Sequence, residues 1–276
     1  MRADLHTHST FSDGLYTPDE VCRLAKEKGV ELLSITDHDT LNGLTEKRLA
    51  AKRYGLAYVS GWEISAYEGM EKVHMLGYGC EPTAAYEAFT NARAEASLLR
   101  AEESVKKFRA LGVDVTLAEV LQMRKEAGSP IHTMHVSRAA AKHLGIPSSE
   151  VYARYLAPGM PANSNVGRPT PEQAIDCIHA IGGVAVIAHP ERMTLGVEDR
   201  EKLLIRLIEY GADGIEAYYT THTEKDVEYF CALAKKLSVF VTGGSDTHFK
   251  DDTHEYGVPR FYASAELMEI LKAEKS

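Results

Sequence analysis

The sequence predicts an α/β fold of about seven strands that closes toward a barrel and carries a helical insertion. Strand-like apolar runs alternate with amphipathic helical segments over residues 1–80, and the alternation resumes over residues 165–276. Residues 81–164 are rich in Ala, Glu, Leu and Arg and show helical periodicity with almost no strand signal. We therefore expect a barrel domain from 1–80 and 165–276, with an enclosed parallel sheet, interrupted by a helical subdomain over 81–164.

The first part of the barrel opens with a strand in DLHTHSTFSDG, and a helix follows in TPDEVCRLAKEKG. Thr17 is the expected N-cap of that helix, with Pro18 in its first turn and Glu20 completing a capping box. Gly29 is expected to end it. The strand ELLSITDHD, a helix near residues 43–54, and the strands LAYVSGWEIS and KVHMLGYG complete this part.

Periodicity and capping residues also predict the elements of the insertion and of the second part of the barrel. One long or two abutting helices are expected in AAYEAFTNARAEASLLRAEESVKKFRALG, and shorter ones in TLAEVLQMRKEAG, MHVSRAAAKHLG and SSEVYARYL. Thr170, Pro171 and Gln173 cap the helix PEQAIDCIHAIGG, which leads into the strand GVAVIAHP. Helices over 198–210 and about 223–237 precede the strands GADGIEAYY and SVFVTGGSDTH.

Composition and charge narrow the class of protein. The 276 residues are 44% hydrophobic and 26% charged, which is ordinary for a globular chain. No apolar run approaches the roughly 20 residues of a membrane span, and no signal peptide is expected. The 4 cysteines are scattered without a CxxC pair, which favours free thiols and a cytoplasmic protein. A net charge of −9 without a basic stripe argues against long nucleic acid, although bound metal cations allow an acidic enzyme to hold an anion.

Histidines and acids gather at the predicted C-terminal ends of the strands. His6 and His8 are separated by one residue in an extended segment, so their side chains share a face. The full set is His6, His8, Asp13, Asp37, His38, Asp39, Glu63, His74, His189, Glu216, Asp246 and His248. In a β/α barrel these strand ends form the active-site face, and imidazoles with carboxylates suit Mn, Fe or Zn. More ligands than one ion can use indicate two or three divalent ions, with Glu63 as a bridge.

The segments DLHTHSTFSDG, TDHDT, GWEIS, HVSRA, AHP and SDTH resemble the motifs of the PHP (polymerase and histidinol phosphatase) family over nearly the whole chain. The resemblance implies a distorted seven-stranded β/α barrel with up to three metal ions. It assigns one ion to His6, His8, Glu63 and Asp246, a second to Glu63, His74 and His135, and a third to Asp13, His38 and His248. His135 lies in the insertion and is assigned from MHVSRAA, with His132 three residues earlier as the alternative.

The stretch YLAPGMPAN, followed by PTPEQAIDCIHAIGGVAVIAHP, resembles the small-phosphoesterase branch of this family. Members of that branch act on nucleoside 3',5'-bisphosphates or nucleoside monophosphates, and some trim short RNA from the 5' end. The resemblance therefore implies hydrolysis of a phosphomonoester of a small nucleotide by metal-activated hydroxide. His189 is a candidate general acid or a further ligand, and Asp246 is a candidate base for the attacking water.

Several further residues are candidates for contacts with the substrate. A guanidinium suits phosphate oxygens, so a second phosphate could be held by Arg138, Arg168 or Arg192, each of which could instead be an ordinary surface residue. His222 lies on a loop that faces the same rim, and it is a further candidate. Tyr219 and its neighbour Tyr218 could stack a base or simply pack.

Three other functions are compatible with the sequence. A histidinol phosphate phosphatase would share the metal rim but would need a pocket for an imidazole and an amine. A non-catalytic metal-binding module, as found in larger polymerases, would be expected to lack several ligands. Hydrolysis of a C–N bond is a third possibility, and activity on amides would distinguish it. The oligomeric state has no signature in the sequence.

Overall fold

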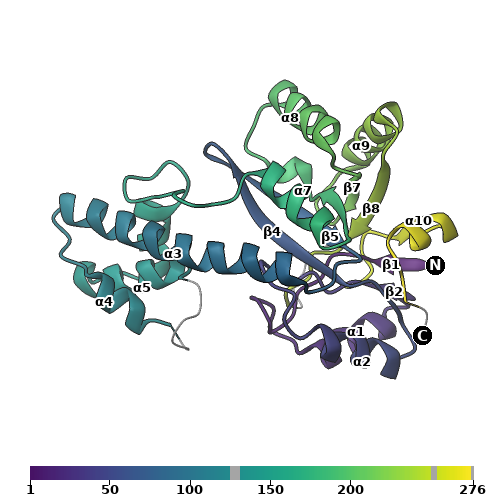
Figure 1. Ribbon diagram of the computed structural model, residues 1–276, viewed down its shortest axis with the longest axis horizontal. Helices are drawn as coiled ribbons and strands as arrows, with labels where there is room; N and C mark the ends of the chain where they lie inside the picture. Colours follow the sequence, from purple (N-terminus) through teal and green to yellow (C-terminus); the bar gives the residue numbers. More distant parts are fainter. Residues whose placement is uncertain (125–130, 250–253, 275–276) are drawn as a thin grey trace. The chain divides into compact units, whose positions relative to one another are not determined.

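The computed structural model of the chain describes residues 1–124, 131–249 and 254–274, which form two compact units. Unit 1 is Met1–Ala66, Lys72–Tyr86 and Thr170–Ser276, and unit 2 is Tyr67–Glu71 and Glu87–Pro169. Figure 1 labels their helices and strands. The last part of the helix expected in TLAEVLQMRKEAG lies outside the described residues.

The strands form two sheets. The first has the order β3-β2-β1-β9, and its strands are β1 (Arg2–Asp4), β2 (Leu32–Leu33), β3 (Ala57–Tyr58) and β9 (Phe261–Tyr262). The second has the order β4-β5-β6-β7-β8, and its strands are β4 (Gly61–Glu68), β5 (Glu71–Tyr78), β6 (Val184–Ile187), β7 (Gly214–Tyr219) and β8 (Phe240–Gly244). The β1–β2–β3 and β6–β7–β8 pairings are parallel, so much of the expected parallel sheet is present.

The sheets differ from the predicted all-parallel barrel in two respects. Only Gly69 and Met70 separate β4 from β5, and a two-residue connection requires strands that run in opposite directions. β5 consequently pairs with β6 in antiparallel register, and β9 pairs with β1 in the same way. The regular ladders form sheets of four and five strands rather than one closed barrel. Two isolated parallel bridges connect the sheets: Thr7, after β1, pairs with Thr247, after β8, and His38, after β2, pairs with Glu63 of β4.

Two helices of unit 1 begin at the caps that the sequence predicts. Thr17 accepts a hydrogen bond from the Glu20 amide and forms a capping box, and Thr170 does the same with Gln173. The helices of unit 1 are α1 (Pro18–Glu27), α2 (Leu44–Arg53), α7 (Pro171–Ala180), the short 3₁₀ turn η2 (Pro190–Arg192), α8 (Val197–Tyr210), α9 (Glu224–Leu237) and α10 (Ala265–Ile270). α1 and α2 pack against β2 and β3, whereas α7 and α9 lie against β6, β7 and β8 (Figure 1).

Unit 2 is helical, as the composition of the insertion predicts. Its elements are α3 (Ala84–Ala110, whose first turn belongs to unit 1), α4 (Leu117–Gln122), α5 (Thr133–Leu144), α6 (Ser148–Val151) and the π-helical turn η1 (Tyr152–Leu156). α3 is one continuous helix of 27 residues. Buried side chains of these helices, with Phe108 fully buried, form a separate apolar core. Among the described helices, none combines the length and the apolar character needed to cross a bilayer.

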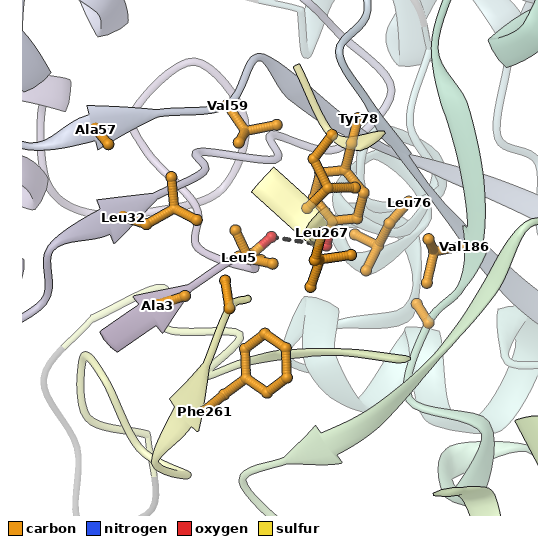
Figure 2. Packing of buried hydrophobic residues seen from close by; sticks show 13 residues of the cluster. Ala3, Leu5, Leu32, Ala57, Val59, Leu76, Tyr78, Val186, Phe261 and Leu267 are labelled. Atoms are coloured by element: carbon orange, nitrogen blue, oxygen red, sulfur yellow. Dashed lines mark hydrogen bonds between the residues drawn. The ribbon is translucent and has the colours of Figure 1, made fainter. Parts of the chain in front are cut away.

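The apolar core of unit 1 lies between the two sheets. Figure 2 shows side chains from β1, β2 and β3 meeting those from β5, β6, β9 and α10. Leu5, fully buried there, directly precedes His6, and the hydroxyl of Tyr78 donates a hydrogen bond of 2.9 Å to the Leu5 carbonyl oxygen. The chain therefore leaves a packed core at the point where its first histidine begins.

Candidate metal centre

His6 and His8 lie directly after β1 and are fully buried. Backbone hydrogen bonds fix this segment against the chain after β8, since the Asp246 amide donates to His6 (2.7 Å) and the His8 amide donates to Thr247 (3.0 Å). Thr7, between the histidines, donates its hydroxyl to the Ser34 carbonyl oxygen. The two imidazole rings consequently share one face, with centroids 5.3 Å apart, as the extended segment predicts.

Two carboxylate oxygens face these imidazoles. Glu63 Oε2 lies 3.2 Å from Nε2 of both His6 and His8. Asp246 Oδ1 lies 3.3 Å from His6 Nε2 and 3.0 Å from His8 Nε2. Among the residues that the structure describes, these four side chains form one of three His/Asp/Glu groups whose ligand atoms lie within 4.8 Å of one another.

A second group surrounds the other oxygen of Glu63. Oε1 lies 2.5 Å from His74 Nδ1 and 3.1 Å from His189 Nε2, and the two nitrogens are 3.2 Å apart. His38 Nδ1 approaches Glu63 Oε2 at 2.9 Å, and His38, Glu63 and His74 also satisfy the geometry of a ligand group. Glu63 therefore faces imidazoles with both of its oxygens.

A third group lies at the surface end of the cluster. His248 Nε2 is 3.2 Å from Asp13 Oδ1, and His38 Nε2 is 3.9 Å from Asp13 Oδ2. His8 Nδ1 is 3.9 Å from Asp13 Oδ1 and completes the group. The side chain of Asp13 is 59% exposed, whereas His8 is fully buried, so this end of the cluster is open to solvent.

The donor atoms fit divalent metal ions. Within the described part of the chain, His6 Nε2, both ring nitrogens of His8, His38 Nδ1, Glu63 Oε2 and Asp246 Oδ1 are buried without a hydrogen-bond partner. A buried polar atom without a partner costs about 1–3 kcal/mol. Ligands about 2.1 Å from one ion lie about 3 Å or slightly more from each other, which is the spacing that these nitrogens and oxygens have. Imidazole and carboxylate together suit Mn, Fe and Zn.

The charge balance of the cluster also favours cations. Burial alone would lower the pKa of His6, but the charges of Glu216, Glu63 and Asp246 raise it well above its ordinary value. Burial alone would raise the pKa of Glu63, but the charges of His38, His74 and His6 hold it well below its usual range. The ionised, buried carboxylates are thus stabilised by positive charge close by, which protons on the imidazoles or metal ions can supply.

Two residues of the cluster have strained backbone conformations. Asp246 has φ of 55° and His189 has φ of 25°, although neither is glycine. Such strain costs about 1–3 kcal/mol per residue and collects at functional sites. Each residue lies two positions after the end of a parallel strand, and the turn there brings its side chain into the cluster.

Glu216 is a member of this site whose role could not be derived from the sequence. It is fully buried on β7, and its Oε1 lies 3.0 Å from His6 Nδ1. Its Oε2 accepts a hydrogen bond of 2.8 Å from the His189 amide. The register of β7 with β8 shifts between Glu216 and Tyr218, which marks a β-bulge beside the site. Its position near a strand end was the only sequence signal.

Four of the substrate-contact candidates lie in unit 1, and one of them, Tyr218, packs its ring against that of Phe261 with centroids 5.3 Å apart. Arg192 Nη1 donates to Tyr219 Oη (2.9 Å) and to Asp246 Oδ2 (3.2 Å), while 55% of its side chain is exposed. Tyr219 is buried and donates its hydroxyl to Asp246 Oδ2 at 2.8 Å, so it packs rather than offering a free face. His222 Nδ1 donates a hydrogen bond of 2.8 Å to the Ala217 carbonyl oxygen, and the His222 ring lies beside that of Tyr219.

The remaining candidates belong to unit 2. His135 lies in the first turn of α5, where its Nδ1 accepts a hydrogen bond of 3.1 Å from the His132 amide. Arg168 lies over the ring of Tyr67 at 4.2 Å and donates to the Thr133 hydroxyl. Arg138 is exposed on α5. The roles that the sequence assigns to these three residues stay predictions.

Comparison with protein families finds one match. The family model described as PHP domain matches residues 4–251. The match includes every metal-ligand candidate that the sequence singles out, from His6 to His248.

Three curated bacterial proteins are similar to this chain over most of their length. The chain is 33% identical over 250 residues to a 3',5'-nucleoside bisphosphate phosphatase of Chromobacterium violaceum, covering 89% of this chain and 86% of that protein. It is 33% identical over 256 residues to a phosphoribosyl 1,2-cyclic phosphate 1,2-diphosphodiesterase of Eggerthella lenta, covering 91% and 95%. It is 30% identical over 253 residues to a 5'-3' exoribonuclease of Haemophilus influenzae, covering 89% of both.

Solved structures have the same fold. A protein from Bifidobacterium adolescentis, assigned as a metal-dependent phosphoesterase, superposes with a TM-score of 0.75 at 26% identity and covers 98% of this chain and 95% of that one. An amidohydrolase from Chromobacterium violaceum with bound sulfate superposes with a TM-score of 0.74 at 31% identity and covers 92% and 90%. The mixed α/β architecture is therefore that of PHP-like structures.

Proposed function

The chain belongs to the PHP domain family, and from this premise we propose that it is a metal-dependent phosphoesterase that removes phosphate from a small nucleotide. The observation that carries the proposal is the position of Glu63, whose two oxygens face different sets of imidazoles. A bridging carboxylate of this kind is expected in a polynuclear metal centre. Enzymes similar to this chain over most of its length are hydrolases of phosphate esters.

The proposed ligand sets follow the three groups. His6, His8, Glu63 and Asp246 would hold the first ion, and Asp13, His38 and His248 the third. For the second ion we propose Glu63, His74 and His189. We prefer His189 to His135, which the family resemblance implies, because the Nε2 of His189 lies next to both of the other proposed ligands. Of the two roles that the sequence leaves open for His189, general acid and further ligand, we propose the ligand role.

Ions bound there would lower the pKa of a coordinated water and neutralise the phosphate oxygens. The protein's own contribution is to orient the reacting groups. Tyr219 and Arg192 fix Asp246 Oδ2, which leaves Oδ1 directed at His6 and His8, in position to be a ligand of the first ion. The exposed part of the Arg192 guanidinium is free to bind a phosphate oxygen from the solvent side.

The proposed substrates are a nucleoside 3',5'-bisphosphate, a nucleoside 5'-monophosphate or the 5' end of a short RNA. The similarity to an exoribonuclease leaves longer RNA open, so the exclusion of long nucleic acid on the ground of net charge stays a prediction. We also propose that the seven strands β1, β2, β4, β5, β6, β7 and β8 form a distorted ring, which the bridges Thr7–Thr247 and His38–Glu63 support.

The test is phosphate release by the manganese-loaded protein from adenosine 3',5'-bisphosphate, 5'-AMP and a 5'-phosphorylated oligoribonucleotide. A strong preference for the bisphosphate would indicate a second phosphate subsite. Equal, fast turnover of 5'-AMP would indicate a general nucleotidase. Release from histidinol phosphate alone, or hydrolysis of an amide instead of an ester, would overturn the nucleotide proposal. A metal-replete Asp246→Ala variant with full activity would contradict the proposed chemistry.

A further inference from the structure

A buried carboxylate outside the ligand groups connects two parts of the cluster. Asp37 is fully buried and directly precedes His38. Its Oδ1 accepts hydrogen bonds from the Ser9 amide and the Ser12 hydroxyl, both at 2.7 Å, and its Oδ2 accepts one from the Ser9 hydroxyl at 2.7 Å. Asp37 therefore ties the start of the loop 9–14 to the segment that carries His38.

Lys47 supplies the counter-charge. It lies on α2 with 1% of its surface exposed, and its Nζ is 2.6 Å from Asp37 Oδ2. Lysine is rarely buried unless it is paired. Because three donors and one cation already surround Asp37, this carboxylate has no free oxygen for a metal ion, and its contacts are those of a structural clamp.

The clamped loop carries Asp13, the most exposed ligand of the third group. The loop is tight, since the amides of Ser12 and Gly14 both donate to the Ser9 carbonyl oxygen at 3.0 Å. A Cβ on Gly14 would lie 2.7 Å from the Ser9 backbone nitrogen, so only glycine fits there. The direction in which Asp13 points consequently depends on where Ser9 is held.

The first group touches this clamp through His8, which directly precedes Ser9, and through the Glu63 amide, which donates to the Asp37 backbone carbonyl oxygen at 3.2 Å, but its other two ligands are held elsewhere. His6 is held by Glu216 and by the Asp246 amide, and Asp246 is held by Tyr219. Asp13 and His38, by contrast, are both attached to segments that Asp37 joins. We propose that the Asp37–Lys47 pair is a positioning device for the third metal position, and that it affects the affinity of that position more strongly than the affinity of the first. This inference rests on the proposed metal centre.

The test compares Lys47→Met with wild type and with Lys52→Met, an exposed lysine on the same helix. Equilibrium dialysis against Mn²⁺, followed by elemental analysis, gives the number of bound ions and the affinity of each. Wild type and Lys52→Met are expected to bind three ions per chain. Lys47→Met is expected to bind one of them about 10- to 100-fold more weakly, as for other residues that orient ligands, and to regain activity when Mn²⁺ is raised.

Ser9→Ala is the second variant, because it removes one hydrogen bond to Asp37 without removing a charge or a proposed ligand. It is expected to lower the affinity for the same ion by a smaller factor. If Lys47→Met does not fold, the affinity measured for Ser9→Ala tests the proposal instead. Unchanged affinities in the folded variants, or an equal loss of affinity for all ions, would overturn the positioning role of the Asp37–Lys47 pair. Either result would leave the phosphoesterase proposal intact. A wild-type chain that binds only two ions at saturation would overturn the third position and this inference together.

Discussion

The carboxylate of Glu216 contacts Nδ1 of His6 at 3.0 Å, while Nε2 of the same ring faces Glu63 and Asp246. Both partners are fully buried. An imidazole nitrogen that binds a metal must present its lone pair, so the proton of a neutral ring must reside on the other nitrogen. Glu216 favours that tautomer because it accepts a hydrogen bond from Nδ1–H. A partner of this kind raises the affinity of a histidine for its ion.

Substituting Glu216 by alanine should therefore lower the affinity for the first ion without removing any ligand. We expect about 10- to 100-fold lower affinity, with Glu216→Gln between wild type and Glu216→Ala because an amide oxygen still accepts the hydrogen bond. Competition with a metal-binding dye measures the affinity. Glu228→Gln, an exposed glutamate on α9, is the matched control. Unchanged affinity in Glu216→Ala would mean that the contact is only structural.

The role of His189 can be separated from that of His135 by counting ions. His189→Ala is expected to lose the second ion, because its Nε2 lies 3.1 Å from Glu63 Oε1 and 3.2 Å from His74 Nδ1. His135→Ala is expected to retain all ions. A His189→Ala variant with full metal content and an altered pH–rate profile would instead support the general-acid role. Elemental analysis of the dialysed proteins distinguishes the outcomes.

Local features of the fold could be predicted from the sequence because their causes are local. The capping boxes at Thr17 and Thr170 are present, and the helical composition of the insertion corresponds to the continuous helix α3. The strand-end positions of His6, His8 and Asp246 were also visible, since residues at the ends of parallel strands meet at one edge. The antiparallel direction of β5 does not follow from the strand pattern, because it depends on Gly69 and Met70 reversing the chain between β4 and β5.

The parts that the sequence did not reveal are contacts between distant segments. Glu216 and His6 are 210 residues apart, and the local sequence around neither residue predicts their contact. Lys47 lies in a helix with many charged residues, where a lysine is ordinarily exposed, yet it pairs with a buried aspartate from another segment. The assignment of His135 as a ligand likewise depended on a motif, whereas the contact of His189 Nε2 with Glu63 Oε1 at 3.1 Å joins residues that are far apart in the sequence.

Arg192 offers a test of phosphate binding that leaves the metal ligands in place. Arg192→Met removes a half-exposed guanidinium that contacts Asp246 Oδ2 and Tyr219 Oη. A hydrogen bond to a charged group contributes about 1.5–3 kcal/mol, so we expect kcat/KM to fall about 10- to 100-fold. Metal content should stay that of wild type. Arg206→Met, on the exposed side of α8, is the control. Loss of ions in Arg192→Met would show that the arginine supports Asp246 rather than substrate.

Removal of the ions should make stability depend on pH in a way that the loaded protein does not share. In the protein without ions, the carboxylates around His6 and His8 outweigh the effect of burial and raise the pKa of both imidazoles. A raised pKa contributes stability that is complete below the unfolded value of about 6.5 and is lost as the pH rises through the folded value. Glu63 and Asp246 have lowered pKa values, so their contribution is complete above about pH 4.5 and is lost in acid. These four groups therefore favour the chelated protein between about pH 4.5 and 6.5.

Metal ions compete with those protons, because a ligand imidazole must be neutral. The stabilisation by Mn²⁺ should therefore grow as the pH rises, while the chelated protein loses stability above about pH 6.5. Thermal unfolding of the loaded and chelator-treated protein, followed by circular dichroism from about pH 5.5 to 8, measures the difference in Tm. We expect that difference to widen with pH in wild type and to be small throughout in Glu63→Ala, which lacks the bridging carboxylate. A difference that stays constant or narrows with rising pH would contradict ligation of the ions by His6 and His8.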